Sequence, residues 1–136
     1  MEIRTFHDSD TNSVVALWNV VFAYSAPHNE PVSVIQHKLA VQDGLFFVAL
    51  ADNVLIGTVV AGYDGHRGWI YSIAVAPETR RQDVGSALMK HAERELDNRG
   101  CRKVNLQLLA SNAGTAEFYR TLGYAVEERV RMGKLL

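Results

Sequence analysis

A helical stripe between two strand-like segments is the feature that most constrains the fold of this chain. From Val84 to Arg99 apolar side chains recur at positions 84, 88, 92 and 96, and Gly100 stands where a left-handed helix cap belongs. Branched and aromatic residues precede this helix at Trp69–Ala76 and follow it at Lys103–Leu109. A helix that crosses between neighbouring strands makes them parallel, so the pattern predicts a sheet covered by helices.

The remaining segments predict further strands and helices around that unit. Leu45–Ala51 and Val54–Tyr63 flank an Asp-Asn turn and are expected to pair antiparallel, with Trp69–Ala76 as the third strand of a meander. The other expected elements are a strand near Glu2–Phe6, a helix through Val14, Leu17, Trp18, Val21 and Phe22, a helix capped by Ser33 and closed by Gly44, a helix over Gly114–Leu122, and one or two strands within Tyr124–Lys134. The order βααβββαβαβ, with an optional last strand, predicts an α+β fold of three layers around a mixed, mostly antiparallel sheet.

Composition narrows the class of protein. The 136 residues, 48% hydrophobic and 21% charged, are typical of one soluble globular domain spanning residues 1–136. A formal net charge of −1 gives no overall attraction to nucleic acid or to an anionic membrane. The longest apolar stretch is interrupted by Asp52 and Asn53, and the N-terminus lacks the pattern of a signal peptide, so we expect a cytoplasmic protein without a membrane span.

The cysteine and histidine residues give no support for a metal site. Cys101 is the single cysteine, which excludes an intramolecular disulfide and a zinc site built from thiolates. The five histidines show neither HxxxH nor HxH spacing. We therefore expect no metal.

A polar loop from Pro77 to Asp83 leads into the helix that starts at Val84. The free amides of a helix N-terminus and the positive end of its dipole favour an anion, and Arg80 and Arg81 lie beside them in the sequence. The segment therefore predicts a phosphate site, although it contains neither the dinucleotide pattern GxGxxG nor the P-loop pattern. A solvated basic loop that enters a helix is the alternative interpretation.

Two motifs in this order resemble those of the GNAT superfamily of N-acetyltransferases. The residues that match the family's loop pattern are Pro77, Arg80, Val84, Gly85, Ser86 and Leu88, and those that match its second pattern are Asn112, Thr115, Tyr119, Gly123 and Tyr124. The predicted order of elements also resembles the GNAT fold from end to end. The segments 27–31 and 62–68 are similar to a small bacterial single-domain subgroup whose substrate is uncertain.

The resemblance implies transfer of an acetyl group from acetyl-CoA to a primary amine by direct attack. Residues implied to bind acetyl-CoA are Ile73, Ala74 and Val75 along the pantetheine arm, Arg80, Val84, Gly85 and Ser86 at the diphosphate, and Asn112 and Tyr119. Tyr119 is the implied acid that protonates the departing thiolate. The alternatives are a core aromatic for Tyr119, a helix cap for Asn112, and a non-catalytic module that binds acyl-CoA for the whole chain.

Two departures from the family's loop pattern bear on binding. Arg81 and Asp83 stand where the family has glycine, and a residue with a Cβ costs about 1–2 kcal/mol wherever a positive φ is required. As the N-cap of the helix, Asp83 is predicted to accept hydrogen bonds from the amides of Gly85 or Ser86 and thus to compete with a diphosphate. The other possibility is that its carboxylate turns outward.

The acceptor side is less defined by the sequence. His28, Asn29, Glu30, Asp64 and His66 lie in polar segments that could flank an acceptor pocket, and Glu30 with Asp64 would suit a cationic acceptor; turn and surface roles are the alternatives. No glutamate lies on the strand before the loop, so water is a candidate for the base. The acceptor is expected to be a small-molecule amine or a protein amine, and the protein a monomer or a homodimer.

Overall fold

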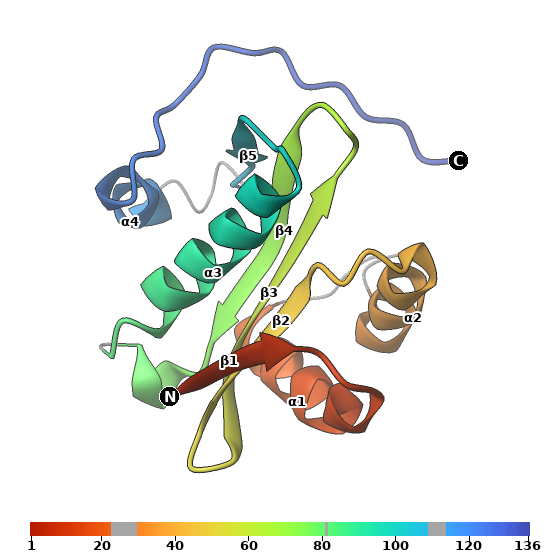
Figure 1. Ribbon diagram of the computed structural model, residues 1–136, viewed down its shortest axis with the longest axis vertical. Helices are drawn as coiled ribbons and strands as arrows, with labels where there is room; N and C mark the ends of the chain where they lie inside the picture. Colours follow the sequence, from red (N-terminus) through yellow and green to blue (C-terminus); the bar gives the residue numbers. More distant parts are fainter. Residues whose placement is uncertain (23–29, 81, 109–113) are drawn as a thin grey trace.

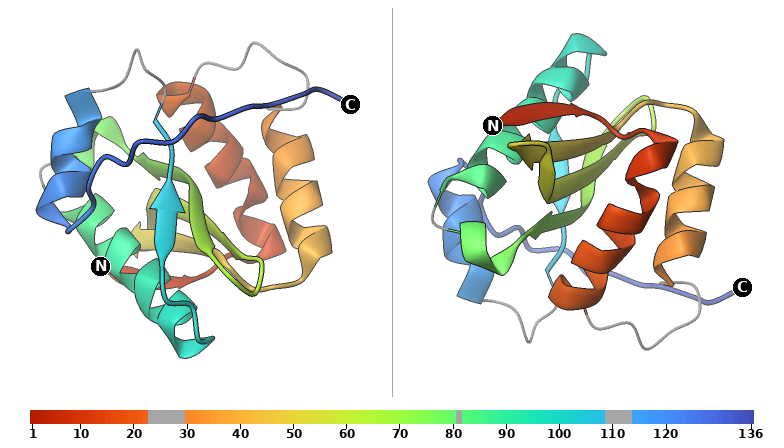
Figure 2. Two further views of the ribbon diagram at one scale, coloured as in Figure 1. Left: turned by 90° about the horizontal axis from the view of Figure 1, so that it is seen from above. Right: turned by 90° about the horizontal axis from the view of Figure 1, so that it is seen from below.

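In the computed structural model a five-stranded sheet separates two pairs of helices (Figures 1 and 2). The structure describes residues 1–22, 30–80, 82–108 and 114–136. The elements are β1 Glu2–Thr5, α1 Thr11–Val21, α2 Pro31–Val41, β2 Phe46–Ala51, β3 Val54–Tyr63, β4 Gly68–Val75, α3 Val84–Asn98, β5 Val104–Leu106 and α4 Ala116–Thr121. Helices α1 and α2 cover one face of the sheet, and α3 and α4 lie on the other (Figure 2).

The strands follow the chain order from β1 to β5. The pairs β1–β2, β2–β3 and β3–β4 are antiparallel, whereas β4 and β5 are parallel. Asp52 and Asn53 connect β2 to β3 with φ angles of 51° and 63°, the two positive values that a tight hairpin turn requires. The predicted meander and the parallel crossing through α3 are therefore confirmed.

Aromatic side chains fill the core between the sheet and α1. Phe6 and Phe46 stack with ring centroids 4.4 Å apart, and Trp18 lies 5.8 Å from Phe46. The indole Nε1 of Trp18 donates a hydrogen bond of 2.8 Å to the Oγ1 of Thr58, so the buried polar groups of α1 and β3 satisfy each other. Since Thr58 faces α1, alternate residues of β3 face the opposite helix layer.

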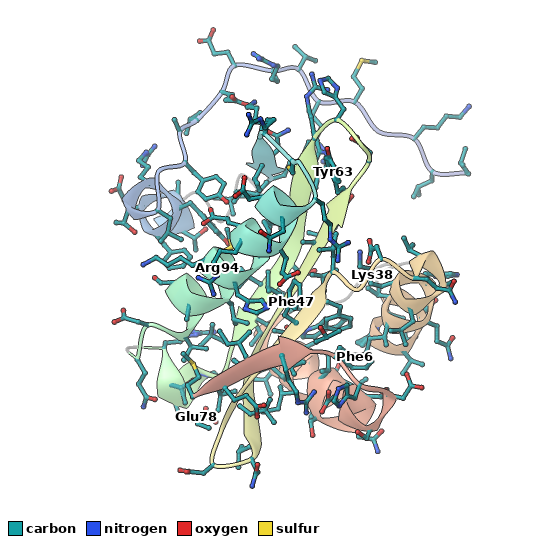
Figure 3. All side chains as sticks on the ribbon, viewed as in Figure 1. Phe6, Lys38, Phe47, Tyr63, Glu78 and Arg94 are labelled. Atoms are coloured by element: carbon teal, nitrogen blue, oxygen red, sulfur yellow. The ribbon has the colours of Figure 1, made fainter. Side chains whose placement is uncertain are left out.

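The other half of the core lies beneath α3. The predicted stripe is confirmed, because Val84, Leu88, Ala92 and Leu96 are all buried. Phe47 of β2 contacts this helix through an edge-to-face arrangement with His91, with centroids 4.6 Å apart (Figure 3). Gly100 has a φ of 88°, as expected for the cap that follows the helix.

Helix α2 begins earlier than the sequence predicted, whereas it ends at Val41, as predicted. Its N-cap is Glu30, whose two carboxylate oxygens accept hydrogen bonds from the amides of Val32 and Ser33, and Pro31 occupies the first helical position, where its fixed φ suits a helix. The assignment of Ser33 as the cap is therefore wrong. At the other end Gln42, with a φ of 57°, terminates the helix before Gly44.

The strand predicted within Tyr124–Lys134 does not form. After α4 the chain is extended but pairs with no strand, and it runs past β5 as an open segment (Figure 1). The apolar residues that favoured a strand, Val126, Val130 and Met132, are at least 75% exposed. Alternating sequence alone does not make a strand, because its amides and carbonyls need a neighbouring chain. The strand predicted over Lys103–Leu109 is likewise shorter, at Val104–Leu106.

Gly57 allows α3 to lie directly on the sheet. A Cβ built at this position would lie 2.9 Å from Cδ1 of Leu88, 3.0 Å from Cγ1 of Val84 and 3.1 Å from the carbonyl oxygen of Ala74. The first two atoms belong to α3 and the third to β4, so both neighbours would have to move. Because Gly57 has no side chain, the start of α3 can pack directly against β3.

Replacing Gly57 by alanine is expected to destabilise the protein by about 1–3 kcal/mol, because the added methyl group overpacks this contact. The measurement is urea denaturation followed by tryptophan fluorescence. Gly114→Ala is the matched control, since a Cβ there would contact nothing within 4 Å. Equal stability of the two variants would contradict this account of the α3 contact.

Candidate active site

The start of α3 presents backbone amides that its N-cap side chain leaves free. Asp83 is the N-cap residue, with a φ of 58° and a ψ of 23°, and its side chain makes no capping hydrogen bond. The predicted bond from Gly85 or Ser86 to this carboxylate is therefore absent. A side chain caps a helix when its backbone is extended, whereas the left-handed conformation of Asp83 carries the carboxylate away.

These amides form a candidate site for an anion. The first hydrogen bond of the helix runs from the amide of Ala87 to the carbonyl of Asp83, at 3.0 Å, so the amides of Val84, Gly85 and Ser86 precede the helical ladder. Arg80 is exposed in the loop just before them, after a short 3-10 turn at Pro77–Thr79. Arg81 lies outside the described residues.

Next to this helix start, β4 has an open edge. β4 is paired with β3 along its length, but over the described part of the chain its ladder with β5 covers only Gly68–Ile70. The amide of Ala76 donates to Ile56 on the β3 side. Since alternate residues of an antiparallel ladder direct their backbone groups to opposite edges, Ile73 and Val75 direct theirs to the open edge, and Ala74 toward β3.

Helix α4 joins Tyr119 to these two features. A Cβ at Gly85 would lie 3.2 Å from the ring of Phe118 and 3.7 Å from Cγ2 of Val75, so the start of α3, the end of β4 and α4 meet at this glycine. Phe118 contacts Tyr119 edge to face, with centroids 5.0 Å apart. The fold thus brings the two sequence motifs together, although Gly85 and Phe118 are more than thirty positions apart in the sequence.

Tyr119 has the properties of a proton donor. Its side chain is only 8% exposed, and this burial raises the pKa of the phenol above its usual value. The group therefore stays protonated at neutral pH. Tyr119 also lines a hollow of about 1220 Å³ between β5, α3, α4 and the chain after Gly123.

A second tyrosine supports the first. Tyr124 contacts Tyr119 edge to face at 6.1 Å, and its hydroxyl donates a hydrogen bond of 2.6 Å to Oε2 of Glu93 on α3. Burial, followed by this bond, raises the pKa of Tyr124, so it too remains a neutral donor. Glu93 was not predicted as a site residue, because nothing in the α3 stripe marks one polar position of the helix as different from the others.

The proposed acceptor residues are only partly described. Asp64 and His66 lie together in the exposed turn between β3 and β4, where Oδ1 of Asp64 accepts hydrogen bonds from the amides of Arg67 (2.7 Å) and His66 (2.8 Å). These bonds lower the pKa of Asp64, which is therefore ionised. Glu30 caps α2, on the other face of the sheet from α3. His28, Asn29 and Asn112 lie outside the described residues.

The described residues contain neither a metal-binding cluster nor a membrane-spanning helix. Within them, no three His, Cys, Asp or Glu side chains gather in a way that could hold a metal ion. No helix in that part of the chain has the length and apolar character needed to cross a membrane.

The left-handed backbone of Asp83 predicts a gain in stability from glycine. Asp83→Gly is expected to raise the free energy of unfolding by about 0.5–1 kcal/mol, because glycine adopts a positive φ without strain. Asp83→Asn should leave it nearly unchanged, and Asp83→Ala should lower it, since alanine tolerates this conformation least. Thermal and urea denaturation of the three variants measure the order. A lower stability for the glycine variant would refute the strain.

Comparison with known proteins identifies the family. The sequence profile of the acetyltransferase (GNAT) family matches residues 11–124. An acetyltransferase of Yersinia enterocolitica is 36% identical over 136 residues, covering all of this chain and 96% of its own. An acetyltransferase of Yersinia pseudotuberculosis is 35% identical over the same 136 residues and also covers 96% of its own length.

Solved structures with the same fold include two in complex with CoA or a CoA analogue. The PaiA N-acetyltransferase of Thermoplasma acidophilum in complex with coenzyme A has a TM-score of 0.81 at 20% identity, covering 95% of this chain and 92% of that one. An AAC(6')-Iy structure with a bisubstrate analogue containing CoA has a TM-score of 0.78 at 21% identity, with 99% and 97% coverage. The profile match, the relatives over the full chain and this shared fold establish that the chain belongs to the GNAT family of acetyltransferases and is an acyltransferase.

Proposed function

We propose that this protein transfers an acetyl group from acetyl-CoA to a primary amine by direct attack. The observation that carries the proposal is the meeting of three features at Gly85: the free amides at the start of α3, the open edge of β4, and the ring of Phe118, which holds α4 and Tyr119 in place. A binding site, a strand edge for an extended ligand and a proton donor are thus within one small region.

The residues present suit the chemistry of acetyl-CoA. A diphosphate requires hydrogen-bond donors in a positive field, which the amides of Val84, Gly85 and Ser86 and the side chain of Arg80 supply. The pantetheine arm contains amides, and these match the backbone groups of Ile73 and Val75 at the open edge of β4. When bound, acetyl-CoA supplies an activated acyl group as a thioester.

The chain's own groups then assist the transfer. Backbone donors of β4 are fixed by the ladder with β3, so they stabilise negative charge on the carbonyl oxygen without reorganising. The amine nitrogen bonds to the carbonyl carbon as the carbon–sulfur bond breaks. Tyr119 gives its proton to the departing sulfur and regains one from solvent, while water takes the proton that the amine loses.

The proposal also covers the acceptor amine, the location of the protein and its oligomeric state. Structures that share this fold include enzymes named for aminoglycosides and a ribosomal-protein-S18-alanine N-acetyltransferase, so small-molecule and protein amines are both candidate acceptors. We expect the protein to act in the cytoplasm as a monomer or a homodimer, with Asp64 and His66 near the acceptor.

Removing the hydroxyl of Tyr119 tests the proton donor. Tyr119→Phe is expected to lower kcat by about 100-fold or more, with little change in the KM for acetyl-CoA, because the phenol acts on the leaving group. The assay follows release of free CoA with a panel of amines.

The pH dependence gives a second test of Tyr119. Because burial raises the pKa of the phenol above its usual value, the activity of the wild type should fall only at a pH above that value, where the phenol loses its proton. Tyr119→Phe has no phenol and should not show this fall.

The phenylalanine next to Tyr119 provides the control for that assay. Phe118→Leu alters the same helix without removing a hydroxyl, and it should retain more activity than Tyr119→Phe. An unchanged kcat and an unchanged pH profile in Tyr119→Phe would refute the assignment. Binding of acetyl-CoA without release of CoA for any amine would instead favour a module that binds without catalysis.

The charge of Asp83 is expected to weaken the binding of acetyl-CoA, although its carboxylate makes no capping bond. Asp83→Asn should tighten binding by about 3- to 10-fold at low ionic strength and by less at 1 M salt, since the repulsion is screened. Isothermal calorimetry measures it. Asp97→Asn, at the exposed far end of α3, is the control and should have no effect. Tighter binding in Asp83→Gly but not in Asp83→Asn would assign the effect to the backbone instead.

A further inference from the structure

Tyr71 stands where β4 loses its neighbour β5. The β3–β4 register passes from Val60 opposite Ser72 to Ala61 opposite Ile70, so Tyr71 is the extra residue of a β-bulge. The ladder with β5 ends at Ile70, one residue earlier. Bulges redirect a side chain, and they are frequent beside active sites. Tyr71 is therefore placed at the opening between the two strands.

The ring of Tyr71 packs over the backbone of Gly62 although much of it is exposed. A Cβ built at Gly62 would lie 2.7 Å from Cε2 and 3.0 Å from the hydroxyl oxygen of Tyr71, so the ring lies over the backbone of a glycine that leaves it room. The residue is nevertheless 63% exposed. Because a tyrosine side chain has only two torsion angles, it offers a ligand a large contact surface at little cost in conformational entropy.

Tyr71 lies on the opposite face of the sheet from Tyr119. Gly62 shares its face of β3 with Thr58, which bonds to Trp18 of α1, whereas Gly57 on the alternate face contacts α3. The start of α3 and α4 are on this second side. In a direct transfer the amine must reach the carbonyl carbon of the thioester from a side that the rest of the bound carrier does not block. The face that carries Tyr71 meets that requirement.

The charges around Tyr71 favour a cation. Partial burial raises the pKa of the Tyr71 phenol, and the carboxylates of Asp64 and Asp43 raise it further. Asp43 is paired with Lys38, which also donates to the carbonyl of Ala61 and so ties α2 to β3. Asp64 forms its hydrogen bonds with backbone amides and keeps its negative charge. An ammonium group is attracted both to this charge and to the face of an aromatic ring.

We propose that Tyr71 binds the acceptor, and that the acceptor is a small amine with a second positive charge. The ring of Tyr71, together with Asp64, binds this second ammonium group. This assignment rests on the proposed transferase function and names the acceptor class for it. The second ammonium stays protonated over the ring while the other, deprotonated by water, attacks the thioester. Tyr71 contributes binding and specificity, and Tyr119 the proton for the leaving group.

Three related amines test the acceptor class: 1,4-diaminobutane, 4-aminobutan-1-ol and n-butylamine. The KM of the wild type should be about 3- to 30-fold lower for the diamine than for the two singly charged amines. Tyr71→Ala should remove this preference and leave the KM for acetyl-CoA unchanged. Tyr71→Phe should keep most of the preference, because the ring remains. Gly62→Ala should weaken it, because the methyl group displaces the ring.

Val54→Ala is the matched control, since Val54 is 62% exposed at the far end of β3 and should not affect any amine. An unchanged preference in Tyr71→Ala, or a loss in Tyr71→Phe as large as in Tyr71→Ala, would overturn the role of the ring. A wild type without preference for the diamine would overturn the acceptor class.

Binding without acetyl-CoA separates this proposal from the proposed function. NMR titration of the free protein with 1,4-diaminobutane should perturb the Tyr71 ring, and Tyr71→Ala should lower the affinity by a similar factor of about 3 to 30. Such binding in a protein that transfers no acetyl group would refute the proposed function alone. Transfer to amines with no contribution from Tyr71 to binding or KM would refute the acceptor assignment alone.

Discussion

The parting of β4 from β5 determines how the molecule can act. β4 keeps its full ladder with β3, so it is rigid, but over the described residues it shares only a three-residue ladder with β5. A strand edge without a neighbour has hydrogen-bonding groups to satisfy, and an extended ligand can satisfy them. The bulge at Tyr71 lies at the same point, and the start of α3 lies at the end of this open edge. The proposed chemistry depends on this one interruption of the sheet.

The elements with strong local signals could be predicted from the sequence. The Asp52-Asn53 hairpin formed because both residues tolerate a positive φ between two branched strands. Helix α3 formed where four apolar residues share one face. The last strand could not be predicted correctly, because the alternation within Tyr124–Lys134 says nothing about the presence of a partner strand. The start of α2 was missed because glutamate is a less common cap than serine.

The site was predictable only in part, for a related reason. Motif spacing placed the start of α3 and Tyr119 together, since both motifs belong to one family pattern. The direction of the Asp83 carboxylate depended on a backbone angle that no residue type specifies. The roles of Glu93 and Tyr71 depend on a neighbour from another element: Tyr124 for Glu93 and Gly62 for Tyr71. Contacts of this kind are set by the packing of layers and strand register, which sequence patterns do not encode locally.

The sheet also separates two layers of helices, and the proposed reaction uses each layer for a different purpose. One layer, with α3 and α4, carries the groups suited to a carrier common to many enzymes, whereas α1, α2 and the β3–β4 turn belong to the other (Figure 2). Under the proposed assignment, substitutions in the second layer alter which amine is accepted and leave the binding of the carrier unchanged. A scaffold divided in this way can diversify its acceptors rapidly while its energy-rich donor stays the same.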